Sequence, residues 1–285
     1  MKIELLEIGF KSWLQTLNYT GSLKTSPRYV KEFLTWIEKQ NIKEIGEITK
    51  TSVKKYFKYL ETRKNKRFAG CLSLNFLRGN LTSLKQFARY LQQTQNETFE
   101  IEISLPVPKS EKQILTKAEI EILYKNCDDN ILGYRDKAML AVYYGCGLRR
   151  TEGVNLDVKD ILFERKVIHV RKGKNNKERY TPMNERVIND LQTYINTARE
   201  FLIREKKENA LFVSKNGNRL TGTAINIRLH NLAKKSEINK KIGLHTLRHS
   251  IATHLLQSGM KLEFVSQFLG HSSLESTQIY THIIN

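Results

Sequence analysis

The sequence feature that most constrains this fold is the placement of its prolines. The chain has 285 residues but only four prolines, and two of them fall together in the segment 105–110, which reads Leu-Pro-Val-Pro-Lys-Ser. Proline fixes its own backbone and disfavours helix in the residue before it. The segment therefore predicts an extended linker over residues 105–114, between one domain at residues 1–104 and a second at residues 115–285.

The first domain is predicted to be helical from the spacing of its apolar side chains. They recur at steps of three and four in four stretches, which run from Leu5 to Leu14, Val30 to Ile37, Val53 to Leu60 and Leu72 to Leu91. Ser26-Pro27 and Thr51-Ser52 are candidate starts of the second and third stretches. Four such helices predict a small all-α bundle.

The second domain mixes helical and strand patterns. Lys117–Tyr124 and Arg135–Tyr144 have helical spacing, whereas Val167–Val170 and Arg179–Met183 are short β-type runs. The polar stretch Lys172–Lys177 contains glycine and asparagine, so it predicts a β-hairpin between the two runs. Helical patterns return near residue 185. The predicted fold is mainly α with a small β-sheet, an α+β domain preceded by the all-α bundle.

The charge of the chain favours a polyanionic partner. Lysine and arginine total 48 against 29 aspartate and glutamate, which gives a net charge of +19, and both halves of the chain share the excess. Nucleic acid is the usual partner of such a protein. A basic loop separates the third and fourth predicted helices. It is interpreted either as a phosphate contact or as a solvated loop without a binding role. Its basic residues are Arg63, Lys64, Lys66 and Arg67.

Membrane insertion and secretion are not indicated. No apolar run approaches the ~18 residues that a membrane helix needs. The N-terminus, Met-Lys-Ile-Glu, lacks the apolar core of a signal peptide. We therefore expect a cytoplasmic protein, associated with the nucleoid and with no membrane partner.

The residues that carry chemistry concentrate near the C-terminus. His245 and Arg248 have i, i+3 spacing on a predicted helix, which places them on one face. A second glycine-terminated helix leads to His271. Ser272 and Glu275 then form a capping-box pattern, and the short helix that they open carries Tyr280.

These segments resemble the C-terminal signature of the tyrosine recombinases, closest to the Xer-type and integrase branch. The match reads His-Thr-Leu-Arg-His-Ser-Ile-Ala-Thr-His-Leu-Leu from residue 245 and Leu-Gly-His-Ser-Ser-Leu-Glu-Ser-Thr-Gln-Ile-Tyr-Thr-His from residue 269. Upstream, residues 144–152 resemble the first arginine box of the family, and residues 173–179 resemble its hairpin lysine box. Four boxes in the right order are far more specific than any one of them.

The resemblance implies a reaction and a role for each residue. Tyr280 would be the nucleophile that attacks a phosphodiester, and Arg149 and Arg248 would stabilise the negative charge of the transition state. Lys174 would protonate the leaving 5′-oxygen, and His245 and His271 would assist by hydrogen bonding and proton transfer. Glu152 would be a supporting acidic residue. The scheme needs no ATP, no metal and no other cofactor.

Several alternatives stay open at this level. Arg150 competes with Arg149 for the arginine role, and Lys172 and Lys177, otherwise interpreted as DNA contacts, compete with Lys174 for the acid role. The histidines at 245, 249 and 254 also suggest a zinc site, although no cysteine or acidic cluster lies near them in the sequence. The segment 261–273 could instead be a DNA-reading helix-turn-helix.

The resemblance also implies partners. It predicts a clamp around double-stranded DNA, with a homotetramer on two recombination sites, while an accessory protein and the target sequence stay open. A type IB topoisomerase shares the site plan, and a catalytically silent DNA-binding protein is the third alternative. Xer-like proteins usually continue beyond the tyrosine into a helix that docks on a neighbouring subunit, whereas this sequence ends five residues after Tyr280. The resemblance therefore does not extend to that helix.

Overall fold

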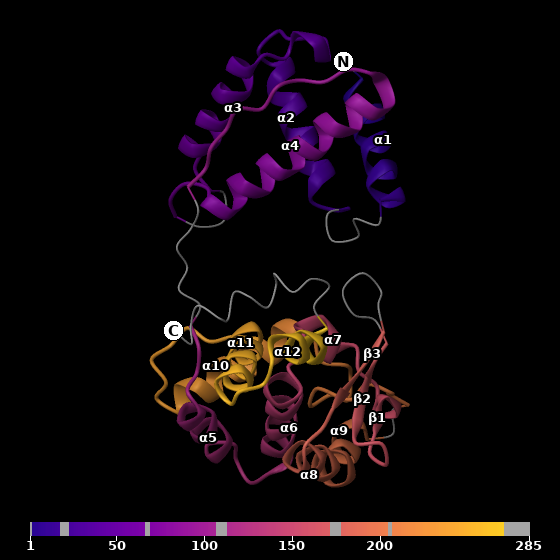
Figure 1. Ribbon diagram of the computed structural model, residues 1–285, viewed down its shortest axis with the longest axis vertical. Coiled ribbons are helices and arrows are strands. Elements are labelled where there is room, and N and C mark those ends of the chain that lie inside the picture. Colours follow the sequence, from indigo (N-terminus) through magenta and orange to yellow (C-terminus); the bar gives the residue numbers. More distant parts are fainter. Residues whose placement is uncertain are drawn as a thin grey trace. The chain divides into compact units, whose positions relative to one another are not determined.

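The computed structural model describes residues 2–17, 23–65, 69–106, 113–171, 178–204 and 207–270 (Figure 1). The chain divides into two compact units, Met1–Ser110 and Glu111–Asn285. In the described ranges, no helix is long and apolar enough to cross a membrane.

The first unit is a helical bundle, as the apolar spacing predicts. Its elements are α1 (Ile3–Thr16), α2 (Ser26–Glu38), the 3-10 turn η1 (Ile45–Glu47), α3 (Lys50–Thr62) and α4 (Leu74–Gln95). The core between the helices combines aliphatic and aromatic side chains, with Phe10 and Phe87 in edge contact at 5.4 Å between ring centroids and Phe33 against Tyr56 at 5.0 Å. Such edge contacts add to the area that the rings bury.

Local capping sets where these helices begin. Ser73 caps α4, since its side chain accepts a hydrogen bond from the backbone N–H of Phe76. Helix α3 begins one residue earlier than the Thr51-Ser52 pair suggests, at Lys50. The reason is a reciprocal cap in which Thr49 and Ser52 each accept the other's backbone N–H, at 3.2 and 2.9 Å.

The second unit is mainly helical, with one small sheet. It opens with α5 (Lys117–Lys125), α6 (Ile131–Leu140), the π-helical turn η2 (Ala141–Gly145), α7 (Arg150–Val154) and the 3-10 turn η3 (Val158–Asp160). The sheet is formed by β1 (Ile161–Leu162), β2 (Val167–Val170) and β3 (Arg179–Pro182). It is followed by α8 (Glu185–Thr193), the π-helical turn η5 (Tyr194–Arg199), α9 (Glu200–Ile203), α10 (Gly222–Lys235), α11 (Leu244–Gln257) and α12 (Leu262–Leu269).

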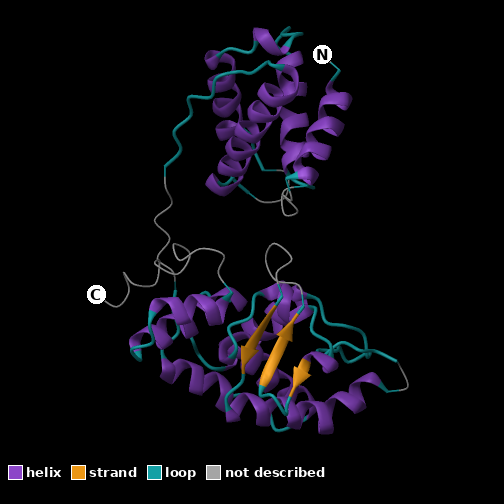
Figure 2. Ribbon diagram, turned by 45° about the vertical axis from the view of Figure 1, so that its right-hand side comes forward, coloured by secondary structure: helices purple, strands orange, loops and turns teal. Residues whose placement is uncertain are grey.

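The sheet is antiparallel in the order β1-β2-β3, with helices beside it (Figure 2). Strand β2 lies in the middle, where Ile168 pairs with Ile161 on one side and with Thr181 on the other. The predicted fold class is thus confirmed, and the two predicted β-runs do pair. The two-residue strand β1 is too short for alternation to reveal it.

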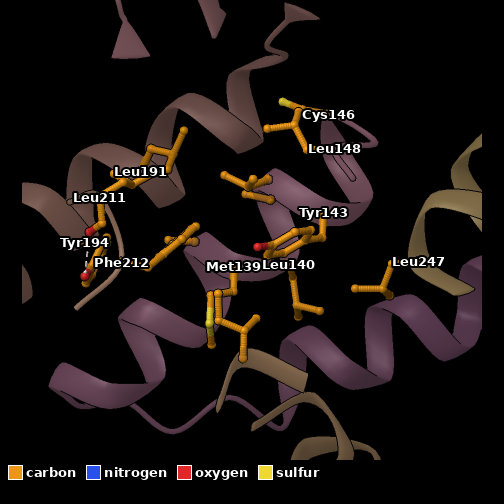
Figure 3. Close-up of a cluster of buried hydrophobic side chains, with 14 of the residues drawn as sticks. Met139, Leu140, Tyr143, Cys146, Leu148, Leu191, Tyr194, Leu211, Phe212 and Leu247 are labelled. Atoms are coloured by element: carbon orange, nitrogen blue, oxygen red, sulfur yellow. Dashed lines mark hydrogen bonds between the residues drawn. The ribbon is translucent and has the colours of Figure 1, made fainter. Parts of the chain in front are cut away.

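The core of the second unit surrounds the end of α6 (Figure 3). Tyr143 of η2 is fully buried there, and a Cβ at Gly153 would come within 2.6 Å of its ring, so α7 approaches η2 closely only because residue 153 is glycine. Tyr194 donates a hydrogen bond to the carbonyl of Leu211 at 2.9 Å. Leu247 brings α11 onto the same core, with 1% of its surface exposed.

Removal of the Leu247 anchor is predicted to destabilise the second unit. We expect Leu247→Ala to lower the free energy of unfolding by roughly 2–5 kcal/mol, because it removes buried apolar surface and leaves a cavity. Urea denaturation followed by circular dichroism measures this. Ile227→Ala on α10 is the control, since Ile227 is 54% exposed and its truncation should change stability by less than ~0.5 kcal/mol. Equal effects of the two substitutions would contradict the packing described here.

Candidate active site

Arg149 stands at the N-terminus of α7, after a tight turn that follows η2. Gly147 in this turn has φ +60°, and a Cβ there would lie 2.9 Å from Leu269 of α12 and 3.3 Å from Ile251 of α11. Glycine therefore allows the turn to lie directly against both helices. The backbone N–H of Arg149 donates to Oε2 of Glu152 at 2.8 Å, which completes the cap of α7.

The guanidinium of Arg149 is held on two sides. Its Nη1 donates to Oε1 of Glu152 at 2.8 Å, and its Nη2 donates to the carbonyl of Gly270 at 2.9 Å. The side chain is 19% exposed. The group is thus fixed but still reaches the surface, as a phosphate-binding arginine requires.

Arg248 reaches the same place from α11. The residue is 4% exposed; its Nη1 donates to the carbonyl of Gly147 at 2.5 Å and its Nη2 to that of Leu269 at 2.8 Å. Arg149 and Arg248 therefore both donate to the last carbonyls of α12, which the helix itself leaves without partners. The negative end of the helix dipole favours cations at this position.

Glu152 is buried between the two positively charged side chains of Arg149 and Arg179. Its side chain is 1% exposed, and both of its oxygens accept hydrogen bonds from Arg179, each at 2.8 Å. Burial by itself raises the pKa of a carboxyl, but the hydrogen bonds from Arg179 and Arg149 outweigh it and lower the pKa of Glu152 to about 2. Glu152 is therefore ionised at neutral pH, and it is not a proton donor.

His245 lies in the first turn of α11, exposed, three residues before Arg248. Partial desolvation, together with the positive charges of Arg150, Arg248 and Arg149, lowers its pKa below the usual value for histidine. The imidazole is therefore neutral at pH 7, with one nitrogen to donate and one to accept a hydrogen bond.

Arg150, the competitor of Arg149, points elsewhere. Its side chain lies along the start of α10, where a Cβ at Gly222 would come within 2.8 Å of its Cδ. Arg150 is exposed, and its charge acts on His245. The arrangement favours Arg149 as the partner of Arg248 in the buried cluster.

Arg179 is the residue of this cluster that has no predicted role of its own. It belongs to the box that resembles the hairpin motif, but only as part of a pattern. One signal was present: Arg179 stands two residues before buried Thr181 in β3, so alternation places both on the same face of the strand. A charged residue at such an inward position needs a buried partner of opposite charge.

Other predicted site residues are placed differently. Arg63 forms an ion pair with Glu32 and lies over the rings of Tyr59 and Phe76, whereas Lys64 is exposed. The remaining predicted residues lie outside the described residues. They are Lys66, Arg67, Lys172, Lys174, Lys177, His271 and Tyr280.

The zinc alternative finds no support in the described part of the chain. There, no group of three or more histidine, cysteine or acidic side chains is arranged to hold a metal ion. Nδ1 of His254 instead lies 2.9 Å from the hydroxyl of Tyr144 in η2.

With this fold and cluster in place, comparison with known proteins defines the class. Residues 113–285 match the phage integrase family. The chain is also 35% identical to the tyrosine recombinase XerD of Staphylococcus saprophyticus, over 99% of this chain and 92% of that protein. The chain therefore belongs to the phage integrase family of tyrosine recombinases.

Solved structures agree with this assignment. The crystal structure of XerA recombinase is 28% identical, with a TM-score of 0.55 over 97% of this chain and 93% of that chain. The XerH site-specific recombinase, in its post-cleavage complex with palindromic difH substrate, has a TM-score of 0.72 at 21% identity, over 96% of this chain and 82% of that chain. The XerH likeness concerns the fold alone.

The pKa of Glu152 predicts how stability depends on pH. Because the folded-state pKa of about 2 lies below the ~4.3 of an exposed glutamate, the carboxylate stabilises the fold above pH ~4.3, and this stabilisation is lost as pH falls toward 2. We expect Glu152→Gln to lower stability at pH 7 by roughly 3 kcal/mol, an order-of-magnitude figure, and to lower it progressively less as the pH falls.

Urea denaturation of both proteins at a series of pH values measures the difference. Glu185→Gln is the matched control, because the side chain of Glu185 is 74% exposed and should show almost no difference from the parent protein at any pH. A Glu152→Gln effect that stays constant down to pH 2 would mean that the carboxylate is not held in this way.

The pKa of His245 gives a second prediction. Arg150→Gln should raise it, because the change removes a nearby positive charge, while desolvation and the remaining arginines keep it below the usual ~6.5. NMR titration of the His245 ring protons measures the pKa. Arg186→Gln, which changes an arginine paired with Glu121, should leave the titration of His245 unmoved.

Proposed function

We propose that this protein is a site-specific DNA recombinase that cleaves and rejoins duplex DNA through a 3′-phosphotyrosine at Tyr280. The observation that carries the proposal is the convergence of Arg149 and Arg248 on the C-terminal carbonyls of α12. In the sequence, His271 follows the last of these carbonyls directly. The same geometry favours the catalytic interpretation of the segment 261–273 over a DNA-reading motif.

The chemistry requires two positive groups at one phosphate. The Tyr280 oxygen attacks phosphorus and loses its proton, and the bond from phosphorus to the 5′-oxygen breaks. Arg149 and Arg248 stabilise the additional negative charge on the non-bridging oxygens, which is usually the largest catalytic contribution. His245, neutral and beside Arg248, contributes a hydrogen bond to the same phosphate and assists proton transfer, with His271.

The return step reverses the first. In the cleavage step Lys174 gives a proton to the departing 5′-oxygen. In the return step a 5′-hydroxyl gives its proton back to Lys174 and attacks the phosphotyrosine, and Tyr280 leaves and regains its proton. One phosphate ester replaces another at each step, so bond energy is conserved and neither ATP nor a metal ion is required. Four protomers on two DNA sites would exchange strands in pairs.

DNA binding draws on the net charge of +19. We propose Lys64, Lys66, Arg67, Lys172 and Lys177 as phosphate contacts. Arg63 was predicted as a further contact. Its side chain is engaged by Glu32, so we propose that it supports the loop.

Covalent trapping tests the proposal. Nicked fragments of genomic DNA from the source organism are incubated with the protein in the presence of a chelator and without ATP, and the attached DNA is captured and sequenced. We expect a few enriched sites with protein at the 3′ end, and none with Tyr280→Phe. Attachment at every sequence would indicate a topoisomerase, and adducts that persist in Tyr280→Phe would refute the nucleophile. DNA binding without any adduct would favour the catalytically silent alternative.

A further inference from the structure

The carboxylate of Glu152 is shared by two guanidiniums from different elements. Oε1 accepts hydrogen bonds from Arg149 Nη1 and from Arg179 Nη1, each at 2.8 Å. Oε2 accepts from the backbone N–H of Arg149 and from Arg179 Nη2, again at 2.8 Å. Arg179 thus donates to both oxygens in the bidentate geometry that suits a guanidinium. The same carboxylate accepts from the backbone and the side chain of Arg149, so Glu152 links Arg179 to Arg149.

Arg179 is itself fixed in place. Its side chain is 13% exposed and extends from the first residue of β3. Gly270, where φ is +64°, lies so close that a Cβ there would come within 2.6 Å of Arg179 Cδ. Since the carbonyl of Gly270 also accepts from Arg149, one backbone position contacts both arginines.

The charge balance explains why two arginines are needed. A buried pair of Arg149 and Glu152 alone would be neutral, and the carboxylate would draw the guanidinium away from a substrate anion. Arg179 supplies a second positive charge, so that the three side chains keep a net charge of +1 while Glu152 stays desolvated and paired. Arg149 can then be oriented by Glu152 and still attract a phosphate.

We propose that Arg179 is a positioning residue for strand cleavage: it holds Glu152, and Glu152 holds Arg149 in the orientation that binds the scissile phosphate. The inference rests on the proposed function. It assigns Arg179 no contact with the reacting atoms, so its effect on the reaction depends on the presence of Arg149.

The chain offers a matched control at the other end of the same connection between strands. Arg171, the residue after β2, donates to Asp160, Asp157 and the carbonyl of Asn155 at 3.0, 2.7 and 3.1 Å, and it makes no hydrogen bond or ion pair with Glu152. Arg171→Gln therefore removes a structural arginine next to the same sheet and leaves the hydrogen bonds that link Arg179, Glu152 and Arg149 in place.

A double-mutant cycle on cleavage of a nicked duplex tests the dependence. Arg179→Gln should slow covalent adduct formation at least about tenfold, since small displacements of a positioned group are costly. In the Arg149→Ala background the same substitution should change the rate less than about twofold. Arg171→Gln should have the same effect in both backgrounds, and Arg179→Lys, which keeps the charge but loses the two-pronged grip, should fall between Arg179→Gln and the parent protein. Equal slowing by Arg179→Gln in both backgrounds would overturn the proposal.

A second measurement does not depend on cleavage. The Nη–H signals of Arg149, assigned by their loss in Arg149→Lys, should exchange with water at least about tenfold faster in Arg179→Gln and Glu152→Gln, because the hydrogen bonds that hold the guanidinium are lost. They should be unchanged in Arg171→Gln. An Arg149 signal unaffected by Arg179→Gln would refute the positioning role even if the protein cleaves no DNA, whereas failure of the parent protein to form adducts would count against the proposed function alone.

Discussion

The site depends on one constraint, which is that two positively charged side chains must be held side by side where little water reaches them. The last carbonyls of α12 meet this need, because a helix leaves them without partners and they carry a partial negative charge. Arg248 donates to the carbonyls of Leu269 and Gly147, and Arg149 donates to that of Gly270. The positive φ of Gly147 is part of the same solution, since any Cβ would push the turn away from α11 and α12. Hydrogen bonds thereby join three segments that are distant in sequence: the turn before α7, helix α11 and the C-terminus of α12.

A buried carboxylate stabilises this pair of arginines without neutralising the positive charge of the site. Two like charges at close range repel, and Glu152 relieves the repulsion while remaining ionised, with its pKa held at about 2. A second guanidinium, from Arg179, gives the three side chains of Arg149, Glu152 and Arg179 a net positive charge. The cost of desolvating Glu152 is offset only if all its oxygen lone pairs find donors, and the structure supplies them from α7 and β3. The cluster thus combines rigidity with a remaining positive charge, and both are properties that a phosphate site needs.

Much of the fold could be predicted from the sequence because its signals are local. The steps of three and four in the first 104 residues predict the helices of the bundle, and the alternating runs on either side of the polar stretch 172–177 predict β2 and β3. The start of α3 differs from the prediction by one residue, because Thr49 and Ser52 cap it reciprocally, and Thr51 between them is a competing cap candidate in the sequence. The strand β1 was missed because two residues carry no period, and the π-helical turns at 141–145 and 194–199 follow from packing that no spacing rule contains.

The sequence by itself determined the chemistry that the chain can attempt. Four motif boxes in order, with His245 and Arg248 one turn apart, restrict the protein to a family and name the candidate residues, because these residue types at this spacing have one common use. Only the tertiary structure decided how Arg149 is oriented and why Arg179 matters. Arg149 and Arg179 are separated by 30 positions in the chain, and their link passes through a carboxylate that each approaches from a different element. A contact between distant segments depends on how whole elements pack, and packing is a property of the folded chain rather than of any local pattern.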